Sequence, residues 1–247
     1  MDQDYIYGRR PVAELLSSDR PVECLMIQKG TEGGAGKLIA LAKARGVPVK
    51  TADVKRLDEL SGGGRHQGAV ALTGAQSYVE LEDILGAGRD KPLLLVLADG
   101  IEDPHNLGAL IRTAESAGAH GLILPSRRSA GLSGVVAKAS AGAIMHLPAA
   151  RVAGLPETIE KLKKAGIWVY GADMAGEPYD QTDFSGPVAL VMGGEGKGLG
   201  RLVKERCDRL VSIPMRGRTE ALNVSVAAGI ILYEIARQRD KAAGKDG

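Results

Sequence analysis

From residue 92 onward, two kinds of segment follow each other along the chain: short apolar runs, and longer segments in which polar and apolar positions are mixed. Short, mainly apolar runs recur at 93–98, 121–124, 167–170, 189–192 and 211–213. Such runs are typical of strands that are buried on both faces. Segments with apolar residues at helical spacing lie between or after them, at 103–117, 155–165 and 222–236. This order predicts an α/β domain over 92–238, with a parallel sheet covered by helices on both faces.

The last of these helical segments has its apolar residues at Leu222, Val226, Ile230 and Tyr233. This spacing repeats every three or four residues, as it does along one face of a helix.

The first part of the chain has shorter elements. Strands are expected at 22–27, 47–49 and 69–72, and helices at 36–45 and 54–60. They predict a separate small α/β domain over 5–76. The acidic, glycine-containing stretch 77–91 is expected to be a linker and hinge, 173–186 a polar loop, and 239–247 a disordered tail.

A glycine-rich turn follows the apolar run 189–192. Five glycines occur in eight residues, at Gly193, Gly194, Gly196, Gly198 and Gly200. Such a turn lets the backbone approach a ligand closely. It is not a P-loop, because Gly198 and not Ser or Thr follows Lys197, and the spacing of the dinucleotide fingerprint also fails. A different ligand, held by backbone groups, is therefore expected here.

Polar residues also follow the run 93–98. Asp103 is suited to cap a helix that begins at Pro104, which places Asn106 in the first turn and Arg112 two turns on. The carboxyl edge of an open α/β sheet is where such folds bind ligands. Plain capping by Asp103, and by Asn223 before the last helix, is an equally good interpretation of those two residues.

Composition narrows the possible partners. The net charge is +2 and only 3% of residues are aromatic, which disfavours non-specific coating of nucleic acid and base stacking on an aromatic platform. Two cysteines, Cys24 and Cys207, are too few for a disulfide framework or a metal cluster, so no metal is expected. The polar first ten residues do not form a signal peptide and no apolar run reaches membrane-spanning length, so a cytoplasmic location is expected.

Three separated motifs carry a family resemblance. The stretches 99–114 (DGIEDPHNLGALIRTA), 191–199 and 212–227 resemble, in this order, the motifs of the SpoU (TrmH-type) branch of the SPOUT methyltransferases. The stretches 7–12 and 65–68 resemble the L30e-like substrate-binding domain that precedes SpoU catalytic domains. Two positions depart from the family pattern, Ala221 where Ser is frequent and Met145 where Glu is frequent.

The resemblance implies an enzyme that methylates RNA ribose 2′-hydroxyls with S-adenosylmethionine, in a homodimer whose catalytic domain has a trefoil knot. The implied cofactor-binding residues are Met192, Gly193, Gly194, Ile213, Met215 and Leu222. The implied catalytic residues are Asn106, Arg112, Glu195, Asn223 and Ser225. The candidate RNA-contact residues are Arg9, Arg10, Arg65, His66, Arg127, Arg128 and Lys138.

The favoured substrate is a guanosine of 23S rRNA. A tRNA enzyme or a resistance-type rRNA enzyme is the nearest alternative within the same chemistry. A non-catalytic RNA-binding or ribosome-assembly factor is the alternative from a different class, and it predicts no cofactor binding.

Overall fold

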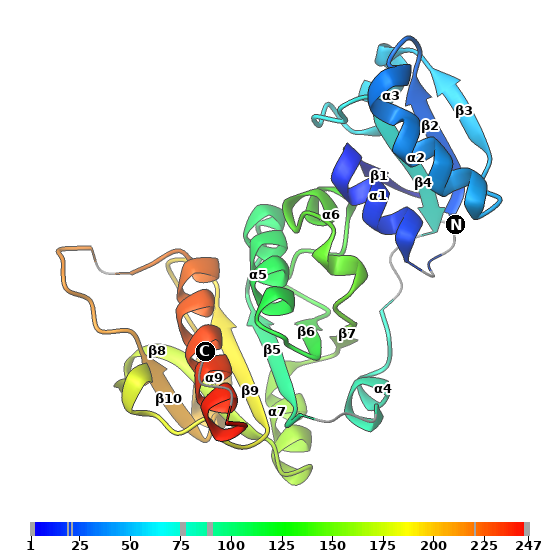
Figure 1. The fold of residues 1–247 in the computed structure, drawn as a ribbon. Helices are drawn as coiled ribbons and strands as arrows, with labels where there is room; N and C mark the ends of the chain where they lie inside the picture. Colours follow the sequence, from blue (N-terminus) through cyan, green and yellow to red (C-terminus); the bar gives the residue numbers. More distant parts are fainter. Residues whose placement is uncertain are drawn as a thin grey trace. The chain divides into compact units, whose positions relative to one another are not determined.

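The computed structural model describes residues 3–18, 20, 22–74, 78–87, 91–219 and 221–244. The chain divides into two compact units (Figure 1). Unit 1 comprises residues 1–77 and 131–146, and unit 2 comprises residues 78–130 and 147–247.

Unit 1 is built on a four-stranded sheet of order β1-β4-β2-β3. Its strands are β1 (Gln3–Tyr7), β2 (Val22–Gln28), β3 (Val49–Ala52) and β4 (Ala69–Gly74). β4 is antiparallel to both of its neighbours, whereas β2 and β3 are parallel. Three helices pack on the sheet: α1 (Arg9–Ser17), α2 (Glu32–Ala44) and α3 (Val54–Leu60).

Side chains of β1 point alternately to the two faces of the sheet, and helices of unit 1 cover both faces. Tyr7 packs in a buried cluster with Val70 and with Leu57 of α3. Because successive strand residues point to opposite faces, the buried Ile6 faces the other side, where α1 and α2 pack against each other. The expected small α/β domain is confirmed. The sequence prediction missed β1 and α1, and it placed β3 two residues too early.

Unit 1 also contains a segment from the middle of the chain. Residues 131–146 carry α6 (Gly134–Ala139) and the 3-10 helix η1 (Ala143–Met145). α6 packs against β1, and a Cβ atom on Gly134 would lie 2.2 Å from the Tyr5 carbonyl oxygen. His146 Nε2 lies 3.0 Å from Glu14 Oε2. The sequence prediction assigned this segment to the domain over 92–238, since a local pattern carries no information on which sheet a helix packs against.

Unit 2 is built on a six-stranded sheet of order β10-β8-β9-β5-β6-β7 in which every neighbouring pair is parallel. Its strands are β5 (Leu94–Asp99), β6 (Gly121–Pro125), β7 (Ala149–Val152), β8 (Trp168–Pro178), β9 (Val188–Gly193) and β10 (Arg209–Ser212). β5 and β9 are central and almost entirely buried, as predicted from their uninterrupted apolar runs.

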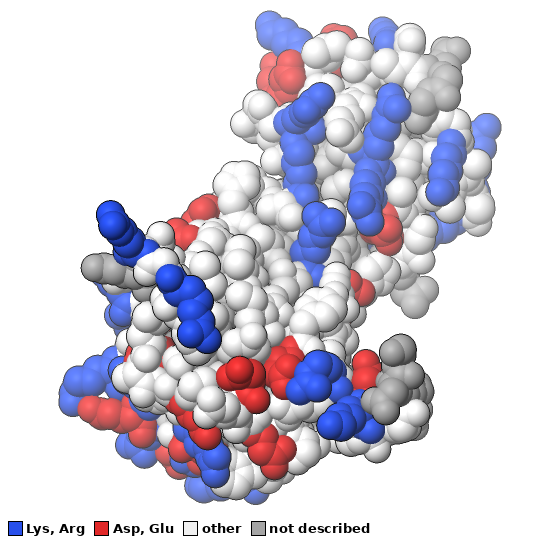
Figure 2. Space-filling view, turned by 60° about the vertical axis from the view of Figure 1, so that its left-hand side comes forward, with Lys and Arg blue, Asp and Glu red and all other residues white. Residues whose placement is uncertain are grey.

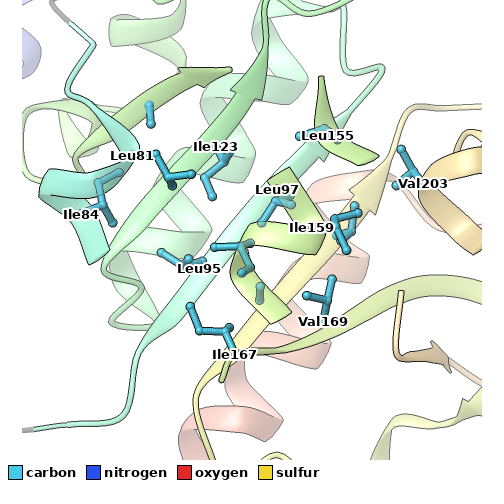
Figure 3. Close-up of a cluster of buried hydrophobic side chains, with 14 of the residues drawn as sticks. Leu81, Ile84, Leu95, Leu97, Ile123, Leu155, Ile159, Ile167, Val169 and Val203 are labelled. Atoms are coloured by element: carbon cyan, nitrogen blue, oxygen red, sulfur yellow. The ribbon is translucent and has the colours of Figure 1, made fainter. Parts of the chain in front are cut away.

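Helices cover both faces of this sheet, so the predicted fold class is confirmed. α4 (Leu81–Gly86), α7 (Leu155–Lys164) and α8 (Arg201–Arg206) contribute to one buried cluster with β5 and β9 (Figure 3). α5 (Pro104–Ser116) and α9 (Val224–Ala242) pack against each other, and α9 contacts β9 on the opposite face. The knot implied by the resemblance stays a prediction.

Part of the stretch that the sequence analysis assigned to a linker is a core element. Leu81 and Ile84 of α4 are buried in the cluster of Figure 3. The prediction was wrong there because the acidic residues of α4 dominate its composition, while the apolar pair at i and i+3 forms a face of only one turn. Gly88 and Asp90, which also supported the linker, lie outside the described residues.

Two further sequence predictions need correction. β8 continues through Pro178 into the expected polar loop, and only the short 3-10 helix η2 (Tyr179–Gln181) follows it. α9 continues to Ala242 within the expected disordered tail, because the Gln238 and Arg239 side chains bind backbone carbonyl groups of unit 2. The last three residues of the tail, 245–247, lie outside the described residues.

The face of α9 that packs on the sheet also differs from the one expected. The buried residues are Val224, Ala228, Ile231, Leu232, Glu234 and Ile235. Within the predicted stripe, Val226 and Tyr233 are 51% and 56% exposed. α9 therefore has a second apolar face that the described part of this chain does not cover.

Candidate functional site

The carboxyl ends of β5 and β9 bring the glycine-rich turn and the start of α5 together. The two strands pair in register up to Asp99 and Gly193. A Cβ atom on Gly194 would lie 2.2 Å from the Gly100 carbonyl oxygen, and one on Gly193 would lie 2.3 Å from the backbone of Gly198. Both positions therefore require glycine, because the backbones on each side leave no room for a side chain.

A cavity of about 500 Å³ lies against this turn, and we call it the first cavity. All six residues predicted to bind the cofactor line it: Met192, Gly193, Gly194, Ile213, Met215 and Leu222. They come from β9, the glycine turn and the segment between β10 and α9. The wall is mainly apolar, since Val211 and Ile231 also contribute. Three separated segments thus converge on one cavity of a size that suits a small organic ligand.

Of the residues that the structure describes, two with charged side chains line the first cavity, the carboxylates Asp173 and Glu195. Burial raises the pKa of Asp173, but hydrogen bonds from the Lys204 ammonium and the Ala175 N–H outweigh it and hold this pKa below its usual range. The Lys204 Nζ atom lies 2.8 Å from Asp173 Oδ2. Asp173 therefore stays ionised at the cavity wall. Asp173 is not among the site residues predicted from the sequence, because the composition of its segment is that of a polar loop.

Four of the five predicted catalytic residues form one hydrogen-bonded network centred on Asn223. Its Nδ2 group donates to Asn106 Oδ1 at 2.9 Å and to Glu195 Oε1 at 2.8 Å. Its Oδ1 atom accepts from the Ser225 hydroxyl at 2.6 Å and from the Ser225 N–H at 3.0 Å. The bond from the Ser225 N–H caps α9. Asn223 is therefore both the capping residue of this helix and a member of the network.

A second cavity, of about 960 Å³, also borders the glycine turn. It is lined by the start of α5, the loop after β6 and the start of α8, with Asn106, Arg127, Arg128 and Arg201 among its residues. The two cavities share Gly194, Glu195, Gly198 and Val224 as a common wall.

The structure separates Arg112 from the other predicted catalytic residues. Its side chain is exposed on α5, and it lines neither the first nor the second cavity. It lies six positions after Asn106, and at 100° per residue this turns it well away from the face that Asn106 occupies. Within one chain, Arg112 therefore does not join the network.

The predicted RNA-contact residues are divided between the two units. Arg127 and Arg128 line the second cavity of unit 2. Arg9, Arg10 and Arg65 are exposed on unit 1, which shows Lys and Arg side chains gathered on one face (Figure 2).

His66 and Lys138 have structural contacts within unit 1. His66 is buried, with Nδ1 accepting from the Gly68 N–H and Nε2 lying 3.2 Å from Asp58 Oδ1. Lys138 Nζ donates to the Arg65 carbonyl oxygen and lies 4.8 Å from the centroid of the Tyr7 ring. Burial, followed by the nearby Arg65, lowers the pKa of Lys138. These contacts hold His66 inside its loop and place Lys138 beside Arg65.

The described part of the chain contains no cluster of three His, Cys, Asp or Glu residues that could hold a metal ion. Within the same residues, no helix is both long and apolar enough to cross a membrane.

Comparisons with known proteins agree with this arrangement. A family model described as the SpoU rRNA Methylase family matches residues 93–233. A model described as RNA 2′-O ribose methyltransferase substrate binding matches residues 5–79. The first match covers the three motifs and both cavities, and the second covers most of unit 1.

Two curated relatives and one solved structure are similar over most of this chain. A Bacillus subtilis protein named as a TrmH family tRNA/rRNA methyltransferase is 48% identical over 242 residues, which are 96% of each chain. The 23S rRNA (guanosine-2′-O-)-methyltransferase RlmB of Ralstonia nicotianae is 48% identical over 206 residues, covering 83% of this chain and 82% of that protein. The AdoMet-bound rRNA methyltransferase of Sinorhizobium meliloti superposes with a TM-score of 0.79 at 28% identity, covering 95% of this chain and 87% of the other.

Proposed function

This chain belongs to the SpoU rRNA methylase family of S-adenosylmethionine-dependent RNA methyltransferases, and we propose that it methylates the ribose 2′-hydroxyl of a guanosine in 23S rRNA. The observation that supports this most directly is the Asn223 network. It lies at the wall between two cavities, where a methyl donor on one side could meet an acceptor on the other.

The first cavity fits S-adenosylmethionine. The donor carries a net positive charge, and the charged side chains of the lining are the carboxylates Asp173 and Glu195. Met192, Ile213 and Leu222 supply apolar surface for the adenosyl group, while Gly193 and Gly194 let backbone groups approach it closely. When bound, the donor supplies a methyl group that its sulfonium centre already activates.

The roles of the chain's own residues then follow from position and chemistry. Glu195 and Asn223 orient the methyl donor in the first cavity. The Asn106 amide donates a hydrogen bond to the incoming 2′-hydroxyl. Ser225 holds the Asn223 amide in the orientation in which its Nδ2 group faces Asn106 and Glu195. Such positioning of two reactants can contribute several kcal/mol to a transfer reaction.

We assign Arg112 to the active site of a second subunit. Guanidinium groups keep their proton in proteins, so Arg112 acts by stabilising charge on the 2′-oxygen or an adjacent phosphate. Two observations support a homodimer in which it does so: Arg112 is exposed and lines neither cavity of its own chain, and α9, which packs against α5, has the uncovered apolar residues Val226 and Tyr233.

The choice of 23S rRNA rests on the relative from Ralstonia nicotianae, whose name gives a 23S rRNA guanosine. The Bacillus subtilis relative has the same identity over a larger share of the chain, and its name covers both tRNA and rRNA, so a tRNA ribose is the second candidate. Deleting the gene and mapping ribose methylation on rRNA and tRNA tests both. A single guanosine of 23S rRNA should lose its methyl group and regain it with purified enzyme and donor. Loss at a tRNA position alone would replace the proposal by the second candidate.

A further inference from the structure

We infer that the second cavity is the pocket for the acceptor nucleotide, with Arg128 and Arg201 as the groups that hold its phosphates. This inference rests on the proposed function and adds to it the place where the RNA enters. Arg201 is not part of any of the three motifs that carry the resemblance.

The connection between the two cavities is the first observation. Asn106 lines the second cavity, Asn223 lines the first, and Glu195 lines both. The Asn223 Nδ2 group joins these residues by hydrogen bonds of 2.9 and 2.8 Å. The hydrogen-bonded network therefore has polar groups in both cavities, so each cavity can hold one of the two reactants beside it. Because the donor fits the first cavity, the second is left for the acceptor.

The distribution of charge is the second observation. Among the described residues, the lining of the first cavity contains carboxylates and no Lys or Arg side chain, whereas that of the second contains Arg127, Arg128, Lys197 and Arg201. All four cations are exposed to solvent. Cations that can bind RNA phosphates are thus found in the second cavity, whereas the charged groups described in the first are carboxylates, which attract a positively charged donor.

The second cavity is also lined by acidic residues, most of which accept hydrogen bonds from backbone or amide groups. Asp99 Oδ2 accepts from the Gly200 N–H at 2.6 Å, and Asp103 Oδ1 accepts from the His105 N–H at 2.9 Å. Glu195 accepts from Asn223, and Glu102 is exposed. A nucleotide needs acceptors for its ribose and base donors as well as cations for its phosphates, so a mixed lining suits it better than a uniformly basic one.

The backbone of Arg128 is the third observation. Its φ angle is +56°, a conformation that side-chain-bearing residues adopt at a cost and that is concentrated at functional sites. Here it occurs at a residue of the cavity lining, in the loop that follows β6.

The test compares three variants. Arg128→Asn keeps a residue type that tolerates positive φ, and Arg201→Gln removes a charge at the start of α8. Arg206→Gln is the matched control, because Arg206 is also exposed on α8 but lines neither cavity. Thermal unfolding of all three checks that each variant is folded.

Affinity is measured for S-adenosylmethionine by calorimetry and for an unmodified 23S rRNA transcript over a salt series. We expect Arg128→Asn and Arg201→Gln to bind the donor within about twofold of wild type and the RNA about three- to tenfold more weakly at ~0.1 M salt, with the salt slope reduced by about 0.7–0.9 for each cation removed. The control should match wild type in both measurements.

Unchanged RNA affinity and salt slope in both cavity variants, or a loss of donor affinity as large as the loss of RNA affinity, would overturn the inference. An equal loss in Arg206→Gln would do the same. A failure of the proposed function can be told apart from a failure of this inference. The proposed function fails if the wild-type enzyme transfers no methyl group to 23S rRNA, whereas the binding measurements need no turnover.

Discussion

Asn223 donates a hydrogen bond of 2.8 Å to Glu195, across 28 positions of the sequence. Glu195 lies in the turn after β9 and Asn223 caps α9, so the bond ties the glycine turn to the last helix. The same amide binds Asn106 at the start of α5. Three motifs that are far apart along the chain therefore meet at one side-chain amide, between the two cavities.

The charge of Glu195 should discriminate between the methyl donor and its product. The donor has a net positive charge, whereas S-adenosylhomocysteine has none. Glu195→Gln keeps the side-chain size and removes the charge, so donor affinity should fall about tenfold, as expected for a charge interaction over ~10 Å at an effective dielectric constant of about 20. Product affinity should change by less than about twofold. Calorimetry measures both, with Glu160→Gln, which affects only a surface ion pair with Arg206, as the control. Equal losses for donor and product would contradict this prediction.

The glycine at position 194 should be indispensable for folding of the turn. In Gly194→Ala the new Cβ atom would meet the Gly100 carbonyl oxygen at 2.2 Å, so the backbone must shift at a cost of about 1–3 kcal/mol. The melting temperature should fall by roughly 2–10 °C, and donor binding should be lost. Gly217→Ala is the control, because a Cβ atom there meets no atom within 4 Å. If both variants bind the donor like wild type, donor binding does not depend on the close approach of the Gly194 and Gly100 backbones.

Replacing Asp173 should cost stability at neutral pH but not in acid. Its pKa is below the usual range in the folded protein: burial raises it, but the hydrogen bonds from Lys204 and Ala175 lower it more. The stabilisation is therefore present above the pKa of the unfolded chain, about 4, and disappears as the pH falls through the lower folded value. Asp173→Asn should lose about 1–3 kcal/mol at pH 7 and differ little from wild type near pH 2. Denaturant unfolding at both pH values measures this, with the exposed Asp180→Asn as control. A destabilisation independent of pH would point to lost packing instead.

The exposed apolar face of α9 should be a subunit interface. Tyr233 is 56% exposed in the single chain, and a carboxylate in its place would be buried without a partner in a dimer. Tyr233→Glu should therefore yield monomers by light scattering at concentrations where wild type is dimeric. Val54→Glu changes an apolar residue of unit 1 that is 47% exposed, and it should leave the dimer intact. A monomeric wild-type protein would reject the homodimer.

Arg112 should act on the site of the other subunit. Homodimers of Arg112→Ala and of Asn223→Ala should each lose at least about 100-fold in turnover, the scale for removing one preorganised group. Subunit exchange between the two should restore about a quarter of wild-type activity, because half of the dimers are mixed and each mixed dimer has one intact site. Differently tagged subunits confirm that exchange has occurred. Mixed dimers that stay inactive would place Arg112 in its own chain's site or outside the chemistry.

Several elements could be predicted because their causes are local. The run 93–98 is apolar at every position, and a run of this length is typical of a strand covered on both faces. Asp103 and Pro104 have the side chains that a helix start requires, and the Asp103 carboxylate does accept from the His105 N–H. The six residues assigned to the cofactor were found through motif resemblance, and all of them line the first cavity.

Other features followed from long-range packing and were missed. The buried pair Leu81 and Ile84 forms too short a pattern to stand out among acidic neighbours. Asp173 belongs to the site because β8 extends beyond its apolar run and brings this residue to the cavity wall. Arg112 and Asn106 belong to one motif and one helix, but six residues of helical twist turn them to different faces.

The sequence by itself determined the central strands β5 and β9, the start of α5, the place of the glycine turn, and the family chemistry that the motifs carry, because these depend on neighbours within a few positions. Only the tertiary structure decided that one amide joins three motifs, that the residues 131–146 pack in unit 1, and that Arg127, Arg128, Lys197 and Arg201 gather in the second cavity. These depend on contacts between residues up to 132 positions apart, and no local pattern of hydrophobicity or charge specifies which distant partner a side chain meets.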